Sequence, residues 1–412
     1  MIRTLLLLGA TGDLARRYLI PALGALEDAG RLPNGFRLVG GARAALDDDG
    51  FRRLAGDALP AERLAYRPVD LADPSSLGAA LGGTPDPVAV YLALPPGAFA
   101  MTIESLGQVS LPPGSRVVVE KPFGDDLESA RRLNAVLRET GQDAYRVDHV
   151  LGMETTQNLV AMRHANPILE RLWNGETVEQ VDILWEETLA LEGRAGYYDH
   201  AGALKDVLQN HMLQLLALVA MNAPAAHDPF HERKLDVLRS ARLATRSRRA
   251  RYTAGTLADG RDVRAYVDEE GVDPARDTET FVEVMLELET PRWSGTRFVL
   301  RAGKALARRR KLVRLSFLGG GELEVGIDGP HDVVLRLHGA ESVPLELRAT
   351  RPGHRLPPYA HVLLDVLGGS NALSISADEA EQAWRIVAPI LAAWEAGEVP
   401  LEDYPAGSAG PS

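Results

Sequence analysis

The chain has 412 residues, of which 45% are hydrophobic and 25% charged, a balance typical of globular proteins with well-packed cores. Its 45 basic and 57 acidic residues give a net charge of −12, which argues against a general affinity for nucleic acid or acidic lipid. The absence of cysteine excludes disulfides, thiolate nucleophiles, iron–sulfur clusters and cysteine-ligated zinc. The length predicts two or three domains.

The apolar segments are too short to span a membrane. The richest one, residues 212–221, is interrupted by Gln214, whereas a transmembrane helix needs about 20 apolar residues. The apolar stretch 4–10 is short for a signal peptide and continues directly into Gly12 and Asp13, so a first β-strand explains it better. We therefore expect a cytoplasmic protein that binds neither membrane nor nucleic acid.

The N-terminal segment has the pattern of a dinucleotide-binding domain. Residues 2–8 are mainly apolar, with four consecutive leucines at 5–8, as expected for a strand buried in a parallel sheet, and a helical pattern covers 19–26. Between them, Gly9 permits a tight turn and Gly12 lets the backbone approach a pyrophosphate at the helix N-terminus. Because the spacing is only G-x-x-G, an ordinary glycine turn of an α/β domain remains an alternative.

The second strand, predicted at 36–40, bears on the choice of coenzyme. NAD-specific domains usually carry an acidic residue near the end of this strand, which binds the ribose 2′-hydroxyl. Here Arg43 follows the strand and the first acid is Asp47. A guanidinium can bind phosphate oxygens in a bidentate manner, so this pattern predicts NADP rather than NAD.

Two further strands are expected at 89–94 and 116–119, with helical stretches between and after them. Strands alternating with helices predict an α/β Rossmann-like domain over residues 1–150. Lys121 follows the second of these strands, at the sheet edge where ligands of such domains bind, so it is a candidate for contact with nicotinamide and substrate. A surface lysine in a turn is the alternative.

From about residue 178 the pattern changes to strands that follow one another with few helices between them. We expect these strands at 178–187, 250–256, 280–289, 297–301, 312–317, 322–327 and 332–337, with helices at 202–221 and 378–394. Such a succession predicts an α+β domain with a large antiparallel sheet over residues 151–412.

The predicted helix 202–221 carries His211 along its apolar stripe. A histidine in such a position is usually a core residue with satisfied hydrogen bonds. The alternative is a general base, since the imidazole titrates near neutral pH. No metal site is expected, because Pro229 would interrupt a helix that placed His227 and His231 on one face.

These motifs together resemble the glucose-6-phosphate dehydrogenase family. The matching segments are collinear and cover nearly the whole chain: 9–15, 93–96, 120–124, 146–152, 157–159, 192–199, 206–211, 252–255, 301–306 and 383–387. The resemblance implies hydride transfer from C1 of an aldopyranose, glucose 6-phosphate above all, to NADP, which yields the 1,5-lactone. It also implies a homodimer or homotetramer whose interface is formed by the large sheet of the C-terminal substrate domain.

The resemblance assigns roles to individual positions. His211 matches the base that removes the C1 hydroxyl proton, and Asp148 matches its carboxylate partner. The implied coenzyme contacts are Gly9, Thr11, Gly12, Asp13, Leu14, Arg43 and Lys121. The implied substrate contacts are Lys121, His149, Glu187, Asp199, Lys304 and Arg309.

Two positions depart from the family pattern. Val150 and Met153 stand where the family has a tyrosine and a lysine of its sugar-phosphate site. Either cations from elsewhere replace these ligands, with Arg163, Arg194 and Lys205 as candidates, or the enzyme acts on an unphosphorylated or differently substituted sugar. A non-catalytic NADP-binding paralogue and an enzyme of the glucose–fructose oxidoreductase type are further alternatives.

Overall fold

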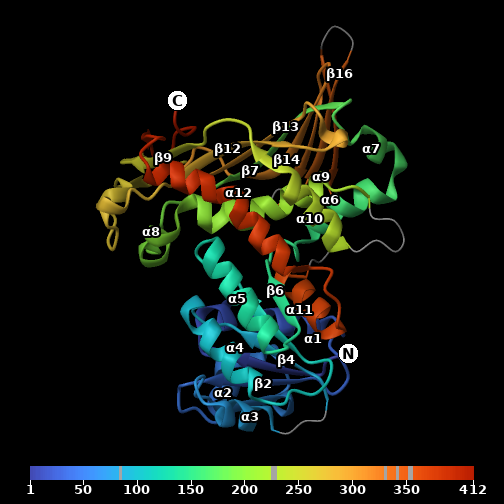
Figure 1. The fold of residues 1–412 in the computed structure, drawn as a ribbon, viewed down its shortest axis with the longest axis vertical. Coiled ribbons are helices and arrows are strands. Elements are labelled where there is room, and N and C mark those ends of the chain that lie inside the picture. Colours follow the sequence, from blue (N-terminus) through green and yellow to red (C-terminus); the bar gives the residue numbers. More distant parts are fainter. Residues whose placement is uncertain (83–85, 224–229, 329–331, 340–342, 351–355) are drawn as a thin grey trace. The chain divides into compact units, whose positions relative to one another are not determined.

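The computed structural model describes the chain except for residues 83–85, 224–229, 329–331, 340–342 and 351–355 (Figure 1). His227 and Pro229 therefore lie outside the described residues. The chain divides into two compact units, Met1–Glu154 with His354–Glu381 and Thr155–Gly353 with Gln382–Ser412. The expected division at residue 150 assigned the whole remainder to the second domain, whereas the structure returns the segment 354–381 to the first unit.

The first unit contains a seven-stranded sheet of order β18-β6-β5-β4-β1-β2-β3. The strands are β1 Thr4–Leu8, β2 Arg37–Ala42, β3 Leu64–Pro68, β4 Val88–Leu92, β5 Arg116–Glu120, β6 Ala144–Val147 and β18 Ser374–Ile375. All neighbours are parallel except β18, which is antiparallel to β6. Strand order reverses on either side of β1, and this reversal marks the edge where doubly wound sheets bind their ligands.

Seven helices accompany this sheet in the part of the unit that the structure describes. They are the π-helix η1 Ala15–Leu19, and α1 Ile20–Asp28, α2 Asp48–Ala55, α3 Pro74–Leu81, α4 Phe99–Gly107, α5 Leu127–Glu139 and α11 Pro358–Gly368, with short 3₁₀ turns at η2 Gly56–Ala58, η3 Ala61–Arg63 and η4 Pro96–Ala98. Helix α11 was not predicted. It belongs to this unit because Val362, Leu363 and Val366 are buried in the same core as Leu5 and Leu7. Burial of this apolar face stabilises the attachment of a segment that lies far away in sequence.

The second unit is built on a ten-stranded sheet of order β17-β16-β15-β14-β7-β13-β12-β9-β19, with β8 also pairing β12. Its strands are β7 Val178–Glu186, β8 Ala241–Leu243, β9 Arg248–Thr253, β12 Phe281–Leu288, β13 Arg297–Gly303, β14 Arg310–Phe317, β15 Glu322–Gly326, β16 Asp332–His338, β17 Pro344–Thr350 and β19 Leu401–Pro405; β10 Gly255–Thr256 and β11 Asp262–Val263 form a separate pair. Most neighbours are antiparallel. The predicted α/β plus α+β architecture is confirmed, while β17 and β19 were not predicted.

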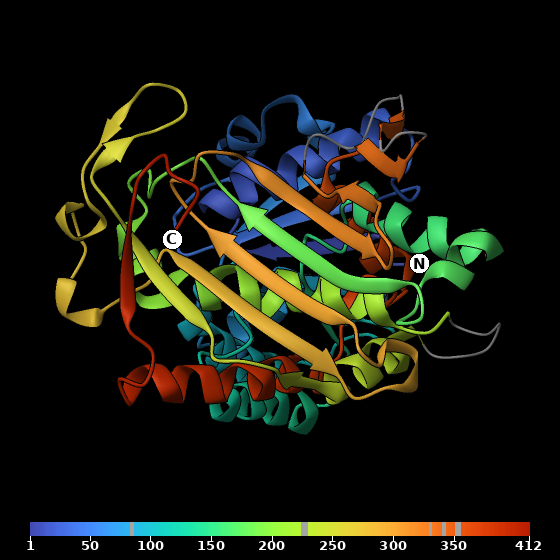
Figure 2. The same cartoon turned by 90° about the horizontal axis from the view of Figure 1, so that it is seen from above.

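The helices of the second unit are α6 Glu154–Ala165, α7 Pro167–Leu172, α8 Ala195–Ala203, the π-helix η5 Leu204–Met212, α9 Leu213–Ala220, α10 Phe230–Ser240 and the greater part of α12 Ala377–Glu395, with 3₁₀ turns at η6 Tyr266–Asp268, η7 Pro274–Arg276 and η8 Pro291–Trp293. Residues of α12 up to Glu381 belong to the first unit. Figure 2 shows the broad sheet from above, with helices beneath it. Val313 and Leu315 are buried, whereas Arg314 between them is half-buried, as the period of two in a strand requires. The sheet therefore has one apolar face and one charged face.

The helix predicted from residue 202 begins at a kink, because Gly202, with φ +63° and ψ 178°, separates the body of α8 from η5. A Cβ atom there would lie 2.4 Å from a carboxylate oxygen of Glu279. That carboxylate accepts a hydrogen bond of 2.9 Å from the backbone N–H of Leu204, at the start of η5. Glu279 thus caps the new helix and requires a glycine before it.

We expect Glu279 to make the stability of the protein depend on pH. Burial raises the pKa of Glu279 to about 7, well above the value of about 4.3 in an unfolded chain. Its contribution to stability is therefore complete below about pH 4.3 and is lost as the pH rises through 7. Between pH 4.5 and 8 the loss amounts to roughly 3 kcal/mol.

Urea unfolding of the wild type and of Glu279→Gln over this pH range tests the prediction. The glutamine variant keeps an oxygen acceptor for the Leu204 N–H but has no charge to bury. The difference in unfolding free energy between the two proteins should change with pH. Parallel curves would contradict the assignment.

Candidate functional site

The turn after β1 has the geometry of a nucleotide-binding loop. Gly9 has φ +85°, and a Cβ atom there would lie 2.1 Å from the carbonyl oxygen of Ala93, at the end of the neighbouring strand β4. The Gly12 N–H donates to the Gly9 carbonyl at 2.9 Å and closes the turn. A Cβ atom placed at Gly12 would have the Gly9 carbonyl oxygen as its nearest neighbour, at 3.2 Å. The backbone at Gly12 is therefore open to a close approach by a phosphate.

The other predicted coenzyme residues of this loop are Thr11 and Leu14, both half-buried, and Asp13, which is exposed. Arg43 lies just beyond β2 and is exposed. Asp47, the first acid after that strand, accepts a hydrogen bond from the Gly50 N–H at 2.7 Å and caps α2. The Asp47 carboxylate therefore already binds a backbone N–H at the start of α2.

Lys121 follows β5 directly and is half-buried. The preceding residue, Glu120, is buried and accepts a 2.5 Å hydrogen bond from the Tyr91 hydroxyl. Burial raises the pKa of Glu120 to about 7, although hydrogen bonds from Tyr91 and Tyr359 oppose the shift. At the end of β5, Lys121 therefore directly follows Glu120, whose carboxyl group is readily protonated near neutral pH.

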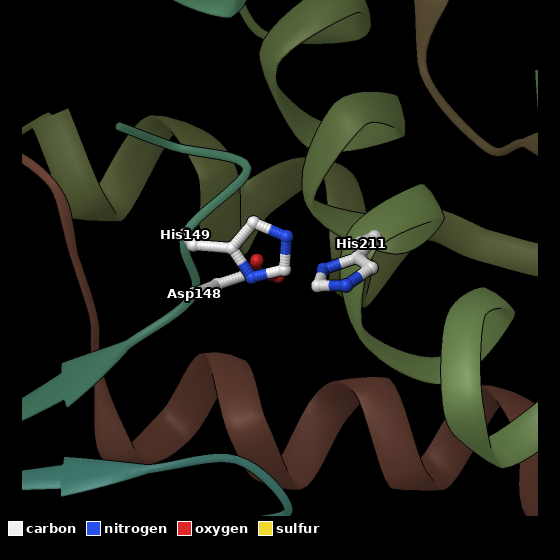
Figure 3. A group of neighbouring side chains, drawn as sticks. All are labelled: Asp148, His149 and His211. Carbon is white, nitrogen blue, oxygen red and sulfur yellow. The ribbon is translucent and has the colours of Figure 1, made fainter. Parts of the chain in front are cut away.

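Asp148 and His149 lie on the segment that leaves β6 (Figure 3). Asp148 is 1% exposed, and its Oδ1 accepts a hydrogen bond of 3.0 Å from the Val150 N–H. The His149 ring stacks on Tyr359 with 5.8 Å between the ring centroids. A Cβ atom at Gly152 would lie 2.4 Å from the carbonyl oxygen of Pro358. The returning segment therefore packs directly against this loop.

Tyr359 is a residue that the sequence did not indicate. It comes from α11, which is separated from the His149 loop by about half of the chain, and no local signal links the two segments. Of the two departures from the family pattern, Val150 is fully buried and Met153 is half-buried. Val150 therefore belongs to the core of the first unit rather than to an open pocket.

His211 lies in the π-helix η5 of the second unit and is 3% exposed (Figure 3). Its ring packs against Trp185 of β7, with 5.4 Å between the ring centroids. Its backbone N–H donates to Asn210 Oδ1 at 2.7 Å. A buried imidazole whose helix and ring are both restrained is preorganised for proton transfer.

Glu187 directly follows β7 and forms ion pairs with two lysines. Lys304 Nζ lies 2.7 Å and Lys311 Nζ 2.8 Å from its carboxylate oxygens. Burial would raise the pKa of Glu187, but the two ammonium groups prevail and lower it to about 2. Lys311 was not predicted as a site residue, yet its Nζ also lies 4.5 Å from the Trp185 ring centroid. Trp185 thus connects this charged cluster to His211.

Asp199 and Arg309, which the resemblance assigned to the substrate, are bound by other groups of the protein. Asp199 is buried and accepts hydrogen bonds from the Tyr266 hydroxyl at 2.7 Å and the Asp273 N–H at 3.0 Å. Its Oδ2 also lies 3.1 Å from Arg276 Nε. Arg309 is exposed and forms an ion pair of 2.7 Å with Asp328. The buried contacts of Asp199 do not favour direct binding of a sugar, whereas the exposed ion pair of Arg309 leaves its predicted role untested.

Asp206 fits the site better than Asp199. A π-helix forms hydrogen bonds between residues five apart, so such residues lie above one another. Asp206 is five residues before His211 in η5 and is half-buried. In an ordinary α-helix, as expected from the sequence, the two side chains would point in different directions. The helix type thus reveals a residue that the α-helical pattern could not.

The three cations considered as replacement phosphate ligands differ in their surroundings. Arg163 is 1% exposed and is held by Glu170 at 2.5 Å and by the Val219 carbonyl at 2.8 Å, which contradicts its proposed role. Arg194 is exposed and precedes α8. Lys205 lines a cavity together with Glu279 and other residues of the α8–η5 junction.

A doubly wound sheet with a glycine-rich turn, and a second unit with a buried histidine beside an ionised carboxylate and two lysines, define a nicotinamide-dependent oxidoreductase. The chain belongs to the glucose-6-phosphate dehydrogenase family. The family profiles described as "Glucose-6-phosphate dehydrogenase, NAD binding domain" and "Glucose-6-phosphate dehydrogenase, C-terminal domain" match residues 6–158 and 160–412.

Individual relatives agree with this assignment. The glucose-6-phosphate 1-dehydrogenase of Gluconobacter oxydans is 36% identical, covering 98% of this chain and 93% of that protein. The crystal structure of the Mycobacterium avium glucose-6-phosphate 1-dehydrogenase is 31% identical with a TM-score of 0.87, over 100% of this chain and 96% of that one. A glucose-6-phosphate dehydrogenase in complex with glucose 6-phosphate is 26% identical with a TM-score of 0.90, over the same shares.

Proposed function

We propose that this protein is a glucose-6-phosphate 1-dehydrogenase that oxidises C1 of glucose 6-phosphate to the 1,5-lactone with NADP. The observation that carries the proposal is the arrangement in the second unit, where buried His211 packs on Trp185 beside the ion-paired Glu187. The names of relatives that match the whole chain favour the phosphorylated sugar over an unphosphorylated one. Retention of Asp148, Lys121 and His211 favours turnover over a non-catalytic role.

The glycine turn fits the coenzyme, because Gly9 and Gly12 leave backbone exposed where a pyrophosphate would lie. NADP held at this turn would supply the acceptor for the hydride that leaves C1. The His211 imidazole removes the proton of the C1 hydroxyl, so that the C1–O bond becomes a carbonyl as the C1–H bond breaks. Asp148 stabilises the resulting imidazolium, and Lys121 contacts both coenzyme and sugar.

The remaining polar residues hold the sugar. Glu187 stays ionised at all physiological pH values, so it accepts hydrogen bonds from sugar hydroxyls, while Lys304 and Lys311 donate to them. Asp206 accepts from a hydroxyl close to His211, whereas Asp199 shapes the surrounding wall. His149, oriented by Tyr359, donates to the phosphate.

The two aspartates provide a matched pair of variants. Asp206→Asn should raise KM for the sugar at least about tenfold, because a charged hydrogen-bond acceptor is lost. Asp199→Asn should instead lower the free energy of unfolding by about 1–3 kcal/mol, with KM little changed, since its partners are protein groups. Steady-state kinetics and urea unfolding distinguish the two, and the reverse pattern would restore Asp199 to the sugar site.

Steady-state NADPH formation with a panel of sugars tests the proposed function. The panel contains glucose 6-phosphate, glucose, galactose 6-phosphate and glucosamine 6-phosphate. We expect the highest kcat/KM for glucose 6-phosphate. A higher value for glucose would show that Val150 and Met153 have redirected the enzyme to an unphosphorylated sugar.

We expect Arg43 to provide the preference for NADP. Its guanidinium is exposed just beyond β2 and forms no ion pair within the described part of the chain, so it is available to the 2′-phosphate. Arg43→Ala should raise KM for NADP roughly 10- to 100-fold and leave KM for NAD nearly unchanged. Parallel titrations with the two coenzymes measure this, and equal losses would refute the assignment.

We also propose a cytoplasmic homodimer or homotetramer that uses the sheet of the second unit as its interface. The charged face of this sheet carries ion pairs such as Glu186–Arg310 at 2.5 Å and Arg314–Glu324 at 2.7 Å. Charges of both signs on one surface suit an interface between identical subunits. Within the described residues, every helix is too short or too polar to cross a membrane.

A further inference from the structure

A cavity of about 450 Å³ lies within the second unit, where the end of α8, strand β9 and the C-terminal part of α12 meet (Figure 1). Its wall includes Lys205 of η5, Arg249 of β9 and Trp394 of α12. The described residues that line it include neither His211 nor Glu187, so it is separate from the proposed sugar site. Its volume is in the range of small-molecule binding sites.

Two cations of this wall form no ion pair within the described part of the chain. Lys205 is half-buried and has no carboxylate partner there. Arg249 is also half-buried; its Nε donates to the Val399 carbonyl at 3.2 Å, and its guanidinium lies 5.2 Å from the Trp394 ring centroid. The two side chains therefore bring positive charge to the cavity that no ion pair neutralises.

The remaining charges are paired with each other or exposed to water. Asp199 Oδ2 lies 3.1 Å from Arg276 Nε, and Asp277 lies 3.8 Å from Arg251. Exposed charges are screened by solvent and salt. The other titratable groups around the cavity are exposed His200, exposed Glu395 and the buried Tyr198 hydroxyl.

Glu279 is the buried acid of this wall, and its carboxylate accepts the Leu204 N–H at 2.9 Å. Burial raises the pKa of Glu279 to about 7, although the charges of Arg249 and Lys205 oppose the shift. Both cations therefore lie near this one carboxyl group. At neutral pH the carboxyl is protonated in about half of the molecules, and its protonated form leaves both cations uncompensated.

We infer that this cavity binds a phosphate group between the Lys205 ammonium and the Arg249 guanidinium, and that Glu279 takes up a proton from solvent as the phosphate binds. A phosphate monoester carries nearly two negative charges at neutral pH, which match the two cations once Glu279 is neutral. A guanidinium can bind two of its oxygens, and an ammonium adds a point charge. The volume of the cavity exceeds that of a phosphate ion and favours a small phosphate ester.

The site borders the helix that carries the proposed base. The Lys205 carbonyl accepts a hydrogen bond of 2.8 Å from Asn210 Nδ2, and Asn210 Oδ1 accepts the His211 N–H at 2.7 Å. The binding itself does not depend on the reaction, because it requires neither coenzyme nor sugar. Its failure would leave the sugar assay unaffected, and a negative sugar assay would leave this site standing.

Calorimetric titration of the enzyme with glycerol 3-phosphate, in the absence of NADP, tests the site. Arg249→Gln should weaken binding at least about tenfold, because a charged hydrogen-bond donor is lost. Lys205→Gln should do the same, and it serves as the test if Arg249→Gln folds poorly. Glycerol, which lacks the phosphate, should not bind. Inorganic phosphate shows whether the free ion binds as tightly as the ester.

Arg248→Gln is the matched control. Arg248 is the neighbour of Arg249 on β9, so its side chain points to the opposite face of the strand, where it binds Glu402 at 2.8 Å. Its affinity for glycerol 3-phosphate should stay within about twofold of the wild type. A ligand in the sugar-phosphate site would bind all these variants equally, and that result would overturn the inference.

Sulfate tests the proton uptake, because it keeps two negative charges between pH 7 and 9. Since Glu279 is half protonated in the free protein near pH 7, sulfate should bind about fivefold more tightly at pH 7 than at pH 9. Calorimetry in buffers of different ionisation enthalpy should show uptake of roughly 0.3–0.5 proton per sulfate at pH 7. The range begins above the usual pKa of histidine, about 6.5.

Glu279→Gln provides the control for this measurement. The glutamine keeps an oxygen acceptor for the Leu204 N–H but cannot take up a proton. Its affinity for sulfate should be the same at pH 7 and pH 9, with no proton uptake. A wild type whose affinity does not change with pH, or a glutamine variant that retains the change, would contradict the proposed coupling.

Discussion

Replacing His211 with Asn is expected to lower kcat by about 10²–10⁴-fold, which is the range contributed by a positioned general base. The variant should still fold, because asparagine is smaller and the backbone contact of residue 211 with Asn210 does not depend on the side chain. KM for NADP should change little, since the coenzyme turn lies in the first unit. Steady-state kinetics with glucose 6-phosphate, together with fluorescence titration of NADPH, measures these effects.

His200→Asn is a suitable control for His211→Asn. His200 lies in α8 of the same unit and is exposed, with its Nδ1 3.2 Å from the Gly196 carbonyl. Its replacement should leave kcat within about twofold of the wild type, as is usual for surface positions. A His211 variant that retained more than a tenth of wild-type kcat would show that another group serves as the base.

Replacing Asp148 with Asn should lower kcat by about 10²-fold or more, because the imidazolium that forms during the reaction loses its carboxylate partner. Asparagine keeps an oxygen that can accept the Val150 N–H, so the turn after β6 should persist. KM for glucose 6-phosphate should rise much less than kcat falls. This split distinguishes a role in proton transfer from a role in sugar binding.

Two controls accompany the Asp148 variant. Urea unfolding should show a free energy close to that of the wild type, because buried Asp148 is replaced by a residue of the same shape. Asp148→Ala should unfold more readily, since the Val150 N–H loses its acceptor and is left buried. If Asp148→Asn were as unstable as the alanine variant, its loss of activity would reflect misfolding of the turn.

The sequence predicted the features that depend on local pattern. The apolar strand β1 followed by Gly9 is such a feature, because burial on both faces and a tight turn each restrict the residue types allowed at those positions. Alternation along β12 and β14 likewise indicated the second sheet. Arg43 and Lys121 were placed at the ends of strands by the same reasoning.

Other features required contacts between residues far apart in the chain. Glu279 caps η5, which is a π-helix that carries Asp206 and His211 five residues apart, and we propose that this spacing places Asp206 near the base. No residue pattern within 202–221 indicates that the carboxylate of Glu279, which lies just before β12, binds the first backbone N–H of η5. The α-helical expectation therefore missed Asp206.

The sequence did not indicate the ion-pair partners of Lys311 and Asp199 either. Lys311 lies in a basic run that could equally have been solvated, and only the register of β14 beside β7 brings it to Glu187 and Trp185. Conversely, Asp199 lies within a segment that matches the family pattern, but its carboxylate is bound by the Tyr266 hydroxyl and the Arg276 guanidinium.

By itself, the sequence determined the two kinds of sheet, the coenzyme turn, the catalytic candidates and the family, because these follow from local patterns and collinear motifs. Only the tertiary structure decided that α11 returns to the first unit, that Tyr359 stacks on His149 and that Lys311 shares Glu187. Each of these depends on packing between distant segments, and the hydrophobic burial and ion pairing that produce such packing leave no periodicity in the chain.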